Sequence, residues 1–322
     1  MALAKSECTV GSPRPMIHGV LLLDKPAGLT SNAALQRVRR LFGRIKAGHT
    51  GTLDPLATGL LPICLGEATK FSHSLLDADK TYEAVIRLGF VSSTGDAEGA
   101  IQEAGMPDFD DEKLQEVVRA FTGPILQRPP MHSALKKDGR PLYEYARAGI
   151  EVDRPVRNIL IKKLEVIDLK KNVLSIKVTC SKGTYIRVLA QDMGDALDCG
   201  GYLMALRRTR IADLDIAAAI GLEDLEKSRP VVAATHVLPV DLLVSAYPEL
   251  RLDSAEAKRV STGLEVRLAV EVVPQGPVRL YGPTGNFLGV GEGRSGGIVA
   301  PKRILANSAA VPQKPANVRL TP

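Results

Sequence analysis

Hydrophobic residues along this chain follow two periods, one typical of strands and one typical of helices. The apolar run 19–23 predicts a buried strand, which Asp24-Lys25-Pro26 ends. Residues 81–88 and 174–180 alternate between apolar and polar side chains, and this period of two predicts strands with one buried face. Strands are therefore expected throughout the first 180 residues.

Apolar residues spaced three and four apart predict a helix following each of these strands. The expected N-terminal caps are Thr30 or Ser31, Asp110 or Asp111, and Thr184, and the expected ends are Gly43, Gly123, and Gly200 or Gly201. Residues 127–137 are too interrupted for either element and predict a long surface loop. From about residue 251, short strands separated by turns such as 282–286 predict a small β domain.

These patterns divide the chain into four regions and predict the α+β class. Residues 1–15 show no periodicity and predict a flexible N-terminal arm. A large domain of strands and helices is expected over 16–248, and a small β-rich domain over 249–310. Residues 311–322 predict a flexible tail.

Positive charge is concentrated at the start of the chain. Of the 322 residues, 42 are Lys or Arg and 36 are Asp or Glu, which gives a net charge of +6. The first 50 residues hold the whole excess, with two acidic side chains and the basic residues Lys5, Arg14, Lys25, Arg37, Arg39, Arg40, Arg44 and Lys46. This distribution predicts attraction to a polyanion such as a phosphate backbone, while a solvated helix face remains an open alternative.

Cysteines, histidines and apolar runs narrow the class of protein further. The four cysteines form no CxxC pair and are too few for a disulfide framework, which suits a reducing cytoplasm. The five histidines lack metal-ligand spacing, so no metal or other cofactor is expected. No signal-peptide pattern and no apolar run long enough to span a bilayer is present, so we expect a soluble, cytoplasmic protein.

The candidate for chemistry is a single carboxylate in an unusual loop, residues 48–60. Asp54 is surrounded there by glycine, proline, threonine and small apolar residues. Glycines permit positive φ and close approach of a ligand, and Pro55 stiffens the chain directly after the acid. Such a loop can present Asp54 to a substrate, although a turn aspartate that caps the following residues is the alternative reading.

Several segments together resemble the TruB-type tRNA pseudouridine synthases. The resemblance runs from about residue 19 to 210, and more weakly to the C-terminus. It rests on residues 19–26, the Asp54 loop extended through 62–70, 80–82, 133–136, 142–147, 181–187 and 206–208. A departure is His132, where relatives often carry a tyrosine. The resemblance implies a pseudouridine-synthase catalytic domain with a mixed, largely antiparallel sheet, and a PUA-like, RNA-binding C-terminal domain.

The resemblance also implies a role for each site residue. Asp54 would be the nucleophile, Tyr82 would stack on the target base and handle its C5 proton, and Arg187 would pair with Asp54 and favour its charged form. The flipped nucleotide would contact His49, Tyr185 and Leu206, and the pocket or phosphates would contact Lys25 and Lys70.

The residue types alone leave ordinary alternatives open for these positions. Tyr82 lies on the apolar face of a predicted strand, where a tyrosine is usually part of the core. Arg187 falls in a first helical turn, where the helix dipole does not favour a cation and a solvated arginine is usual. Lys25 precedes a proline and reads as a turn lysine, and His49 reads as a structural histidine.

The implied reaction is the isomerisation of uridine-55 in the T-arm of tRNA to pseudouridine, on a nucleotide flipped out of the RNA. The tRNA substrate would be its only partner, and it would need no cofactor, no metal and no other protein. We expect a monomer. One alternative is a tRNA-binding folding factor that acts without catalysis. Another is a guide-dependent pseudouridine synthase. A glycoside hydrolase is a more distant rival, because it normally needs two carboxylates at a set separation.

Overall fold

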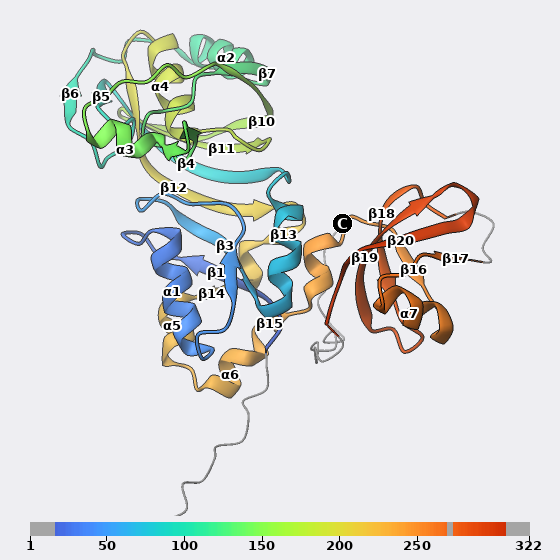
Figure 1. Ribbon diagram of the computed structural model, residues 1–322. Coiled ribbons are helices and arrows are strands. Elements are labelled where there is room, and N and C mark those ends of the chain that lie inside the picture. The colour runs from blue at the N-terminus through green and yellow to red at the C-terminus, as the bar shows by residue number, and fades with distance from the viewer. Residues whose placement is uncertain (1–16, 269–272, 307–322) are drawn as a thin grey trace, which may run out of the picture.

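The computed structural model describes residues 17–268 and 273–306 (Figure 1). The arm and the tail expected at residues 1–15 and 311–322 lie outside the described residues. Around one large sheet, helices and a second, smaller sheet are arranged in an α+β fold.

The main sheet contains eleven strands and is mixed but largely antiparallel, as the family resemblance implies. Its order is β14-β1-β3-β12-β4-β11-β10-β7, and β13, β15 and β2 pair at its sides. The strands are β1 (Gly19–Lys25), β2 (Ala47–His49), β3 (Thr58–Leu65), β4 (Lys80–Leu88), β7 (Gly123–Gln127), β10 (Arg157–Lys170), β11 (Val173–Cys180), β12 (Gly201–Ile211), β13 (Leu214–Asp215), β14 (Ile220–Gly221) and β15 (Val237–Leu238). The parallel pairs are β1 with β14 and β12 with β3.

Strands β4 and β12 lie in the middle of this sheet, and helices cover its two halves (Figure 1). Helices α1 (Ser31–Leu41), α5 (Leu222–Lys227) and α6 (Pro230–Thr235) lie in the half that holds β1 and β3. Helices α2 (Asp111–Ala120), α3 (Leu142–Arg147) and α4 (Ile186–Ala196) lie in the half that holds β10 and β11. Two-stranded hairpins, β5 (Phe90–Ser92) with β6 (Ile101–Glu103) and β8 (Lys136–Lys137) with β9 (Arg140–Pro141), complete that half.

The helix ends show which sequence signals the chain uses. Thr30 and Asp110 cap α1 and α2 as predicted, each accepting a hydrogen bond from a first-turn amide. The prediction that Thr184 caps α4 is wrong, because its hydroxyl donates to the Ser181 carbonyl and Tyr185 takes the cap position. Gly123 does not end α2, which stops at Ala120; it opens β7 instead.

The two faces of β1 and β3 pack into different cores. Leu21, Leu23, Leu61 and Ile63 point to the face covered by α1 and belong to the larger core. Their neighbours in sequence pack on the opposite face against the 3₁₀ helices η1 (Gly66–Leu75) and η3 (Val240–Val244). Because β3 is buried on both faces, it shows no alternation of apolar and polar residues.

A second sheet near the C-terminus forms the predicted β-rich unit. Its order is β16-β18-β19-β20-β17, and it packs with one helix, α7. The elements are β16 (Glu249–Arg251), α7 (Ser254–Ser261), β17 (Val266–Arg267), β18 (Gly276–Tyr281), β19 (Phe287–Arg294) and β20 (Ile298–Ile304), with the short 3₁₀ helices η2 (Ile216–Ala218) before them and η4 (Ser295–Gly297) within them. The turn predicted at 282–286 joins β18 to β19.

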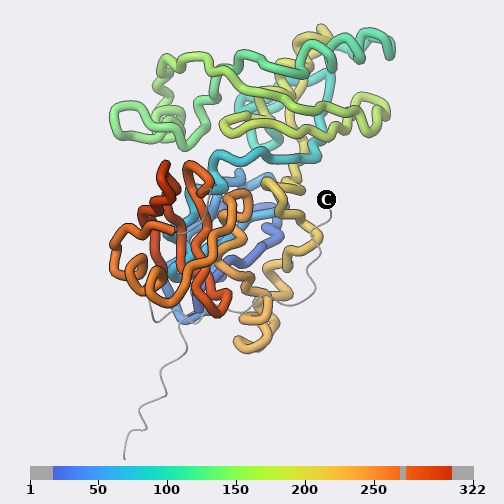
Figure 2. Tube along the Cα trace, turned by 90° about the vertical axis from the view of Figure 1, so that its right-hand side faces the viewer, coloured from blue at the N-terminus to red at the C-terminus, as the bar shows by residue number. Residues whose placement is uncertain are grey.

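Contacts through η1 hold this small unit against the half of the chain that contains β1 (Figure 2). The rings of Phe71 and Phe287 pack with their centroids 5.7 Å apart. The Lys70 ammonium donates to the Ile304 carbonyl, and the Glu67 carboxylate accepts from the Ala306 amide. Within the described ranges, no helix is both long and apolar enough to cross a membrane.

Candidate active site

The loop that carries Asp54 connects β2 to β3 and is fixed directly on both sides of the acid. The Ser31 hydroxyl donates to the Leu53 carbonyl at 3.0 Å and accepts from the Leu53 amide at 2.8 Å. On the other side, the Pro55 carbonyl accepts a 2.8 Å hydrogen bond from the Gly28 amide. The turn itself closes through the Asp54 carbonyl, so its carboxylate is left free to face the interior of the site.

Lys25 lies beneath this loop with its side chain fully buried. Its ammonium donates to the carbonyls of Pro26 at 2.8 Å and Leu29 at 2.7 Å, and reaches that of Pro55 at 3.4 Å. Burial lowers the pKa of Lys25 to about 8, against the opposing effect of the Asp54 charge. Lys25 therefore supports the loop from within, which a solvated turn lysine would not do.

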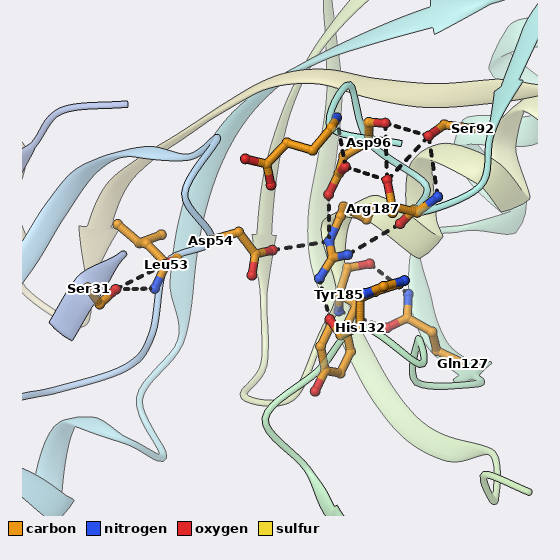
Figure 3. Close-up of polar contacts among 11 residues, drawn as sticks. Ser31, Leu53, Asp54, Ser92, Asp96, Gln127, His132, Tyr185 and Arg187 are labelled. Atoms are coloured by element: carbon orange, nitrogen blue, oxygen red, sulfur yellow. Dashed lines mark hydrogen bonds and ion pairs between the residues drawn. The ribbon is translucent and has the colours of Figure 1, made fainter. Parts of the chain in front are cut away.

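Arg187 faces Asp54 from the first turn of α4, and the two form an ion pair (Figure 3). The distance from Arg187 Nε to Asp54 Oδ2 is 3.1 Å. The arginine side chain is 6% exposed, whereas the aspartate side chain is 40% exposed. The Asp54 carboxylate is therefore partly exposed and is paired with a buried cation. The alternative reading, in which Arg187 is a solvated cation, is wrong.

The remaining donors of Arg187 are also used, which holds its guanidinium in one orientation. One terminal nitrogen donates to the Thr94 carbonyl at 3.3 Å, and the other donates to the His132 carbonyl at 2.8 Å. His132 thus contributes to the site through its backbone. This contact uses the carbonyl and does not depend on which side chain the position carries.

Asp96 is a site residue that the sequence reasoning missed. Its carboxylate lies 3.4 Å from Arg187 Nε and is buried. It accepts from the Thr94 hydroxyl at 2.6 Å and from the Glu98 amide at 3.1 Å, as an aspartate in a tight turn commonly does. The polar residues 92–96 were a visible signal for the turn, but nothing local indicated that the turn meets α4.

Tyr82 and Leu206 approach the site from the central strands β4 and β12. Tyr82 is partly buried against the core cluster that includes Leu206, whose neighbour across the strands is Ala84. Burial raises the pKa of Tyr82, with smaller effects that include the negative charge of Asp54. The phenol therefore stays protonated at neutral pH and lies within electrostatic range of the carboxylate.

Tyr185 lies beside the ion pair, and His49 lies on β2 just before the Asp54 loop. The backbone of Tyr185 is clamped by the side-chain amide of Gln127, which accepts at 2.8 Å and donates at 3.1 Å (Figure 3). His49 precedes the loop on β2, and its buried Nδ1 has no hydrogen-bond partner among the described residues. Burial, aided by the nearby Arg208 charge, lowers the pKa of His49 and favours the neutral ring.

The structure does not bring Lys70 to this cluster. Lys70 belongs to η1, which follows the end of β3 that lies away from Asp54. Its ammonium forms an ion pair with Glu67 at 2.6 Å and donates to the Ile304 carbonyl at 2.9 Å. Its predicted contact with a pocket or a phosphate stays a prediction.

Basic side chains gather on the outer surface of α1, as the charge distribution predicted. Arg39, Arg40 and Arg44, together with Gln36, line an open hollow of about 320 Å³. Arg37 differs, because it is ion-paired with Glu226 of α5. Across the residues that the structure describes, no group of three or more His, Cys, Asp or Glu side chains is arranged to hold a metal ion.

Comparison with known proteins identifies the family. Residues 39–186 match the model of the TruB family pseudouridylate synthase N-terminal domain. Residues 187–245 match the tRNA pseudouridylate synthase B C-terminal domain, and residues 248–305 match the C-terminal region of pseudouridine synthase II TruB. These three matches follow one another along nearly the whole described chain.

Individual relatives agree with these models. The chain is 54% identical to tRNA pseudouridine synthase B of Azoarcus sp. (strain BH72), over 91% of this chain and 97% of that protein. It is 51% identical to tRNA pseudouridine synthase B of Dechloromonas aromatica (strain RCB), over 90% and 96%. A chain in the crystal structure of a Cbf5-Nop10-Gar1 complex shares the fold with a TM-score of 0.69 and 26% identity, over 90% and 85%. The chain therefore belongs to the TruB family of pseudouridine synthases.

Proposed function

We propose that this chain converts uridine to pseudouridine in tRNA, acting on uridine-55 of the T-arm with Asp54 as the nucleophile. The observation that carries the proposal is the Asp54 carboxylate, which is held 3.1 Å from the buried Arg187 guanidinium while 40% of its side chain stays exposed. A reactive carboxylate has to be oriented and accessible, and this arrangement supplies both. The names of the relatives, tRNA pseudouridine synthase B, support tRNA as the substrate.

The reaction sets clear demands on the site. The N1–C1′ bond of uridine breaks, the uracil turns, and C5 becomes bonded to C1′, while C5 loses a proton and N1 gains one. Asp54 acts on the base or on the ribose beside it, and its ion pair with Arg187 holds the carboxylate in place. Because the base is inaccessible inside a folded RNA arm, it is flipped into the pocket at a cost of roughly a few kcal/mol.

The surrounding residues are suited to hold the flipped nucleotide. In this proposal Tyr82 stacks on the uracil, and Leu206 packs beside it from β12. His49, from β2, and Tyr185, from the start of α4, contact the nucleotide as well. Lys25 acts indirectly, by supporting the Asp54 loop through the Pro55 carbonyl.

The proposal extends to the two folded regions and to the setting of the enzyme. We assign catalysis to residues 16–248 and additional, PUA-like RNA binding to 249–310, supported by the separate five-stranded sheet that begins with β16. Lys70 lies at the junction of the two and is assigned a contact with an RNA phosphate there. We assign a monomer that works in the cytoplasm without a protein partner. The described cysteines are free and buried, as suits a reducing compartment: Cys64, Cys180 and Cys199.

The test is tritium release from a tRNA transcript labelled at uridine C5, with the purified chain alone. The wild-type chain should release tritium, and Asp54→Asn should bind the tRNA but release none. Asp77→Asn is the matched control, because Asp77 is an exposed carboxylate that pairs only with the exposed Lys182. A transcript without the target uridine should release nothing. Turnover by Asp54→Asn would refute the nucleophile assignment, and release from the control transcript would refute the position.

The same assay separates the two alternative functions. A folding factor would bind tRNA and release no tritium, and a guide-dependent synthase would release it only after a guide RNA is added. Neither is favoured, because relatives that share about half of this sequence are named tRNA pseudouridine synthases.

A further inference from the structure

Arg208 of β12 is a fully buried cation without an acidic partner among the described residues. Its side chain is only 1% exposed and is among the largest fully buried side chains of the molecule. No ion pair within residues 17–268 and 273–306 involves it. Burial lowers the pKa of Arg208. A buried, unpaired charge is unfavourable by several kcal/mol, so a side chain retained in that state usually has a function beyond packing.

The guanidinium of Arg208 is held by two backbone carbonyls that belong to the Asp54 region. Nε donates to the Leu60 carbonyl at 2.8 Å, and one terminal nitrogen donates to the Gly51 carbonyl at 3.1 Å. Gly51 lies three residues before Asp54, on the side of the loop opposite to the Pro55 contact. Arg208 therefore fixes the entry of the loop, as Lys25 fixes its exit.

Arg208 also faces the Tyr82 phenol. The two residues are direct partners in the pairing of β12 with β4. The side chains of directly paired residues lie on the same face of the sheet, and the charge of Arg208 opposes the effect of burial on the pKa of Tyr82. Arginine carries only donors, so in this contact the phenol oxygen accepts. The hydrogen of the phenol is then free to point away from Arg208, toward the pocket.

We propose that Arg208 is a positioning residue that serves two groups of the site at once. It anchors the Asp54 loop through Gly51, and it orients the Tyr82 hydroxyl as a hydrogen-bond donor to the bound nucleotide. In this role the phenol keeps its proton and donates it in a hydrogen bond to the nucleotide. This inference rests on the proposed function.

An arginine is needed because two carbonyl acceptors and the cross-strand Tyr82 phenol lie around one side chain. The planar guanidinium spreads its donors in fixed directions, whereas a lysine ammonium is a single point on a flexible stem. Arg208→Lys keeps the positive charge but loses at least one of the contacts to Leu60, Gly51 and Tyr82. A misplacement of about 1 Å near the reacting atoms lowers a rate by about 100-fold, so we expect the single-turnover rate to fall by about 10- to 100-fold, with tRNA affinity within about twofold of wild type.

Arg207→Lys is the matched control, since it makes the same substitution one position earlier on β12. Arg207 is 40% exposed and paired with Asp24 at 2.7 Å; it also reaches the Thr58 hydroxyl at 3.4 Å, but it shares neither carbonyl contact of Arg208. This variant should retain the wild-type rate. If Arg208→Lys also keeps the wild-type rate, the proposal is overturned.

A double-mutant cycle with Tyr82→Phe distinguishes positioning from a structural effect. If Arg208 acts through the Tyr82 hydroxyl, Arg208→Lys should lower the rate much less in the Tyr82→Phe background than in wild type. Equal factors in both backgrounds would overturn the orientation of Tyr82. Tyr82→Phe alone gives a second test, which does not depend on whether the Arg208 variant folds. Its single-turnover rate should fall by about 10-fold or more while its affinity for tRNA stays unchanged. An unchanged rate would overturn the proposal. No tritium release by the wild-type chain would refute the proposed function, and this inference with it.

Discussion

Removing one hydroxyl at Ser31 should loosen the catalytic loop while leaving the RNA-binding surface intact. Ser31 is 1% exposed, and its hydroxyl makes both hydrogen bonds to Leu53, the residue before Asp54. In Ser31→Ala the Leu53 amide and carbonyl lose these partners inside the protein. A buried polar group left unpaired is unfavourable by about 1–3 kcal/mol, so the free energy of unfolding should fall by about 2–4 kcal/mol.

The same change should slow the chemical step. Lys25 and Gly28 still hold Pro55, so the loop stays attached at one side while the Asp54 carboxylate shifts relative to Arg187. We expect the single-turnover rate to fall by about 10- to 100-fold, the range for a displacement of about 1 Å. The affinity for tRNA should stay within about twofold of wild type, because no phosphate or base contact is assigned to Ser31.

Thr30→Ala is the control that isolates this effect. Thr30 is adjacent in sequence, but its hydroxyl only accepts the cap hydrogen bond from the Ala33 amide at the surface of α1. Loss of that cap should lower the free energy of unfolding by about 1 kcal/mol and leave the rate unchanged. Urea unfolding followed by circular dichroism, with tritium release under single-turnover conditions, measures both quantities. Equal losses in the two variants would refute the loop-anchoring role of Ser31.

Two further substitutions test the packing around the site. Gly59 has φ +103°, and a Cβ there would lie 2.3 Å from the Arg208 carbonyl oxygen, so Gly59→Ala should lower the free energy of unfolding by more than about 3 kcal/mol. Gly28 has φ +80° with nothing within 4 Å of such a Cβ, so Gly28→Ala should lower it by about 1 kcal/mol. Equal losses of stability in urea unfolding would contradict this difference. Burial lowers the pKa of Lys80 from 10.5 to about 8, so the folded chain loses this proton at a lower pH than the unfolded chain. The contribution of Lys80 to the free energy of unfolding therefore rises with pH between those two values. Against Lys80→Met, wild type should therefore gain about 1–2 kcal/mol between about pH 8 and pH 9.5, and a constant difference would contradict the shift.

Local patterns predicted the elements whose periodicity is regular. The strand at 19–23, the two alternating strands and the helix after Thr30 correspond to β1, β4, β11 and α1. Strand β10, the longest, was missed because its pairing with β11 shifts register after Ile161 and again after Val166. Each irregularity turns the following side chains to the other face, so the period of two does not persist.

Local patterns could not predict the site, because its parts come from distant segments. Asp54 stood out in its loop, but its pairing with Arg187 was implied only by the family resemblance. Arg187 by itself looked like a solvated cation, and its burial depends on the carbonyls of Thr94 and His132, which lie far away in sequence. The residues around Asp96 indicated a turn, but they did not indicate that its carboxylate would face Arg187.

The charges of the site also explain why its substrate is expected to be an anion. Lys25, Arg187 and Arg208 are all at least 95% buried; Asp54 and Asp96 both pair with Arg187, and the exposed Glu98 lies nearby. Backbone carbonyls accept the hydrogen bonds of Lys25 and Arg208; Asp54 and Glu98 oppose the lowering of the Lys25 pKa, whereas no carboxylate of the described residues pairs with Arg208. Such a region is less stable than an apolar one of the same volume, and bound RNA phosphates would stabilise it. The excess of buried positive charge therefore favours the state in which RNA occupies the cleft, while Asp54 stays the accessible negative group that meets the nucleotide.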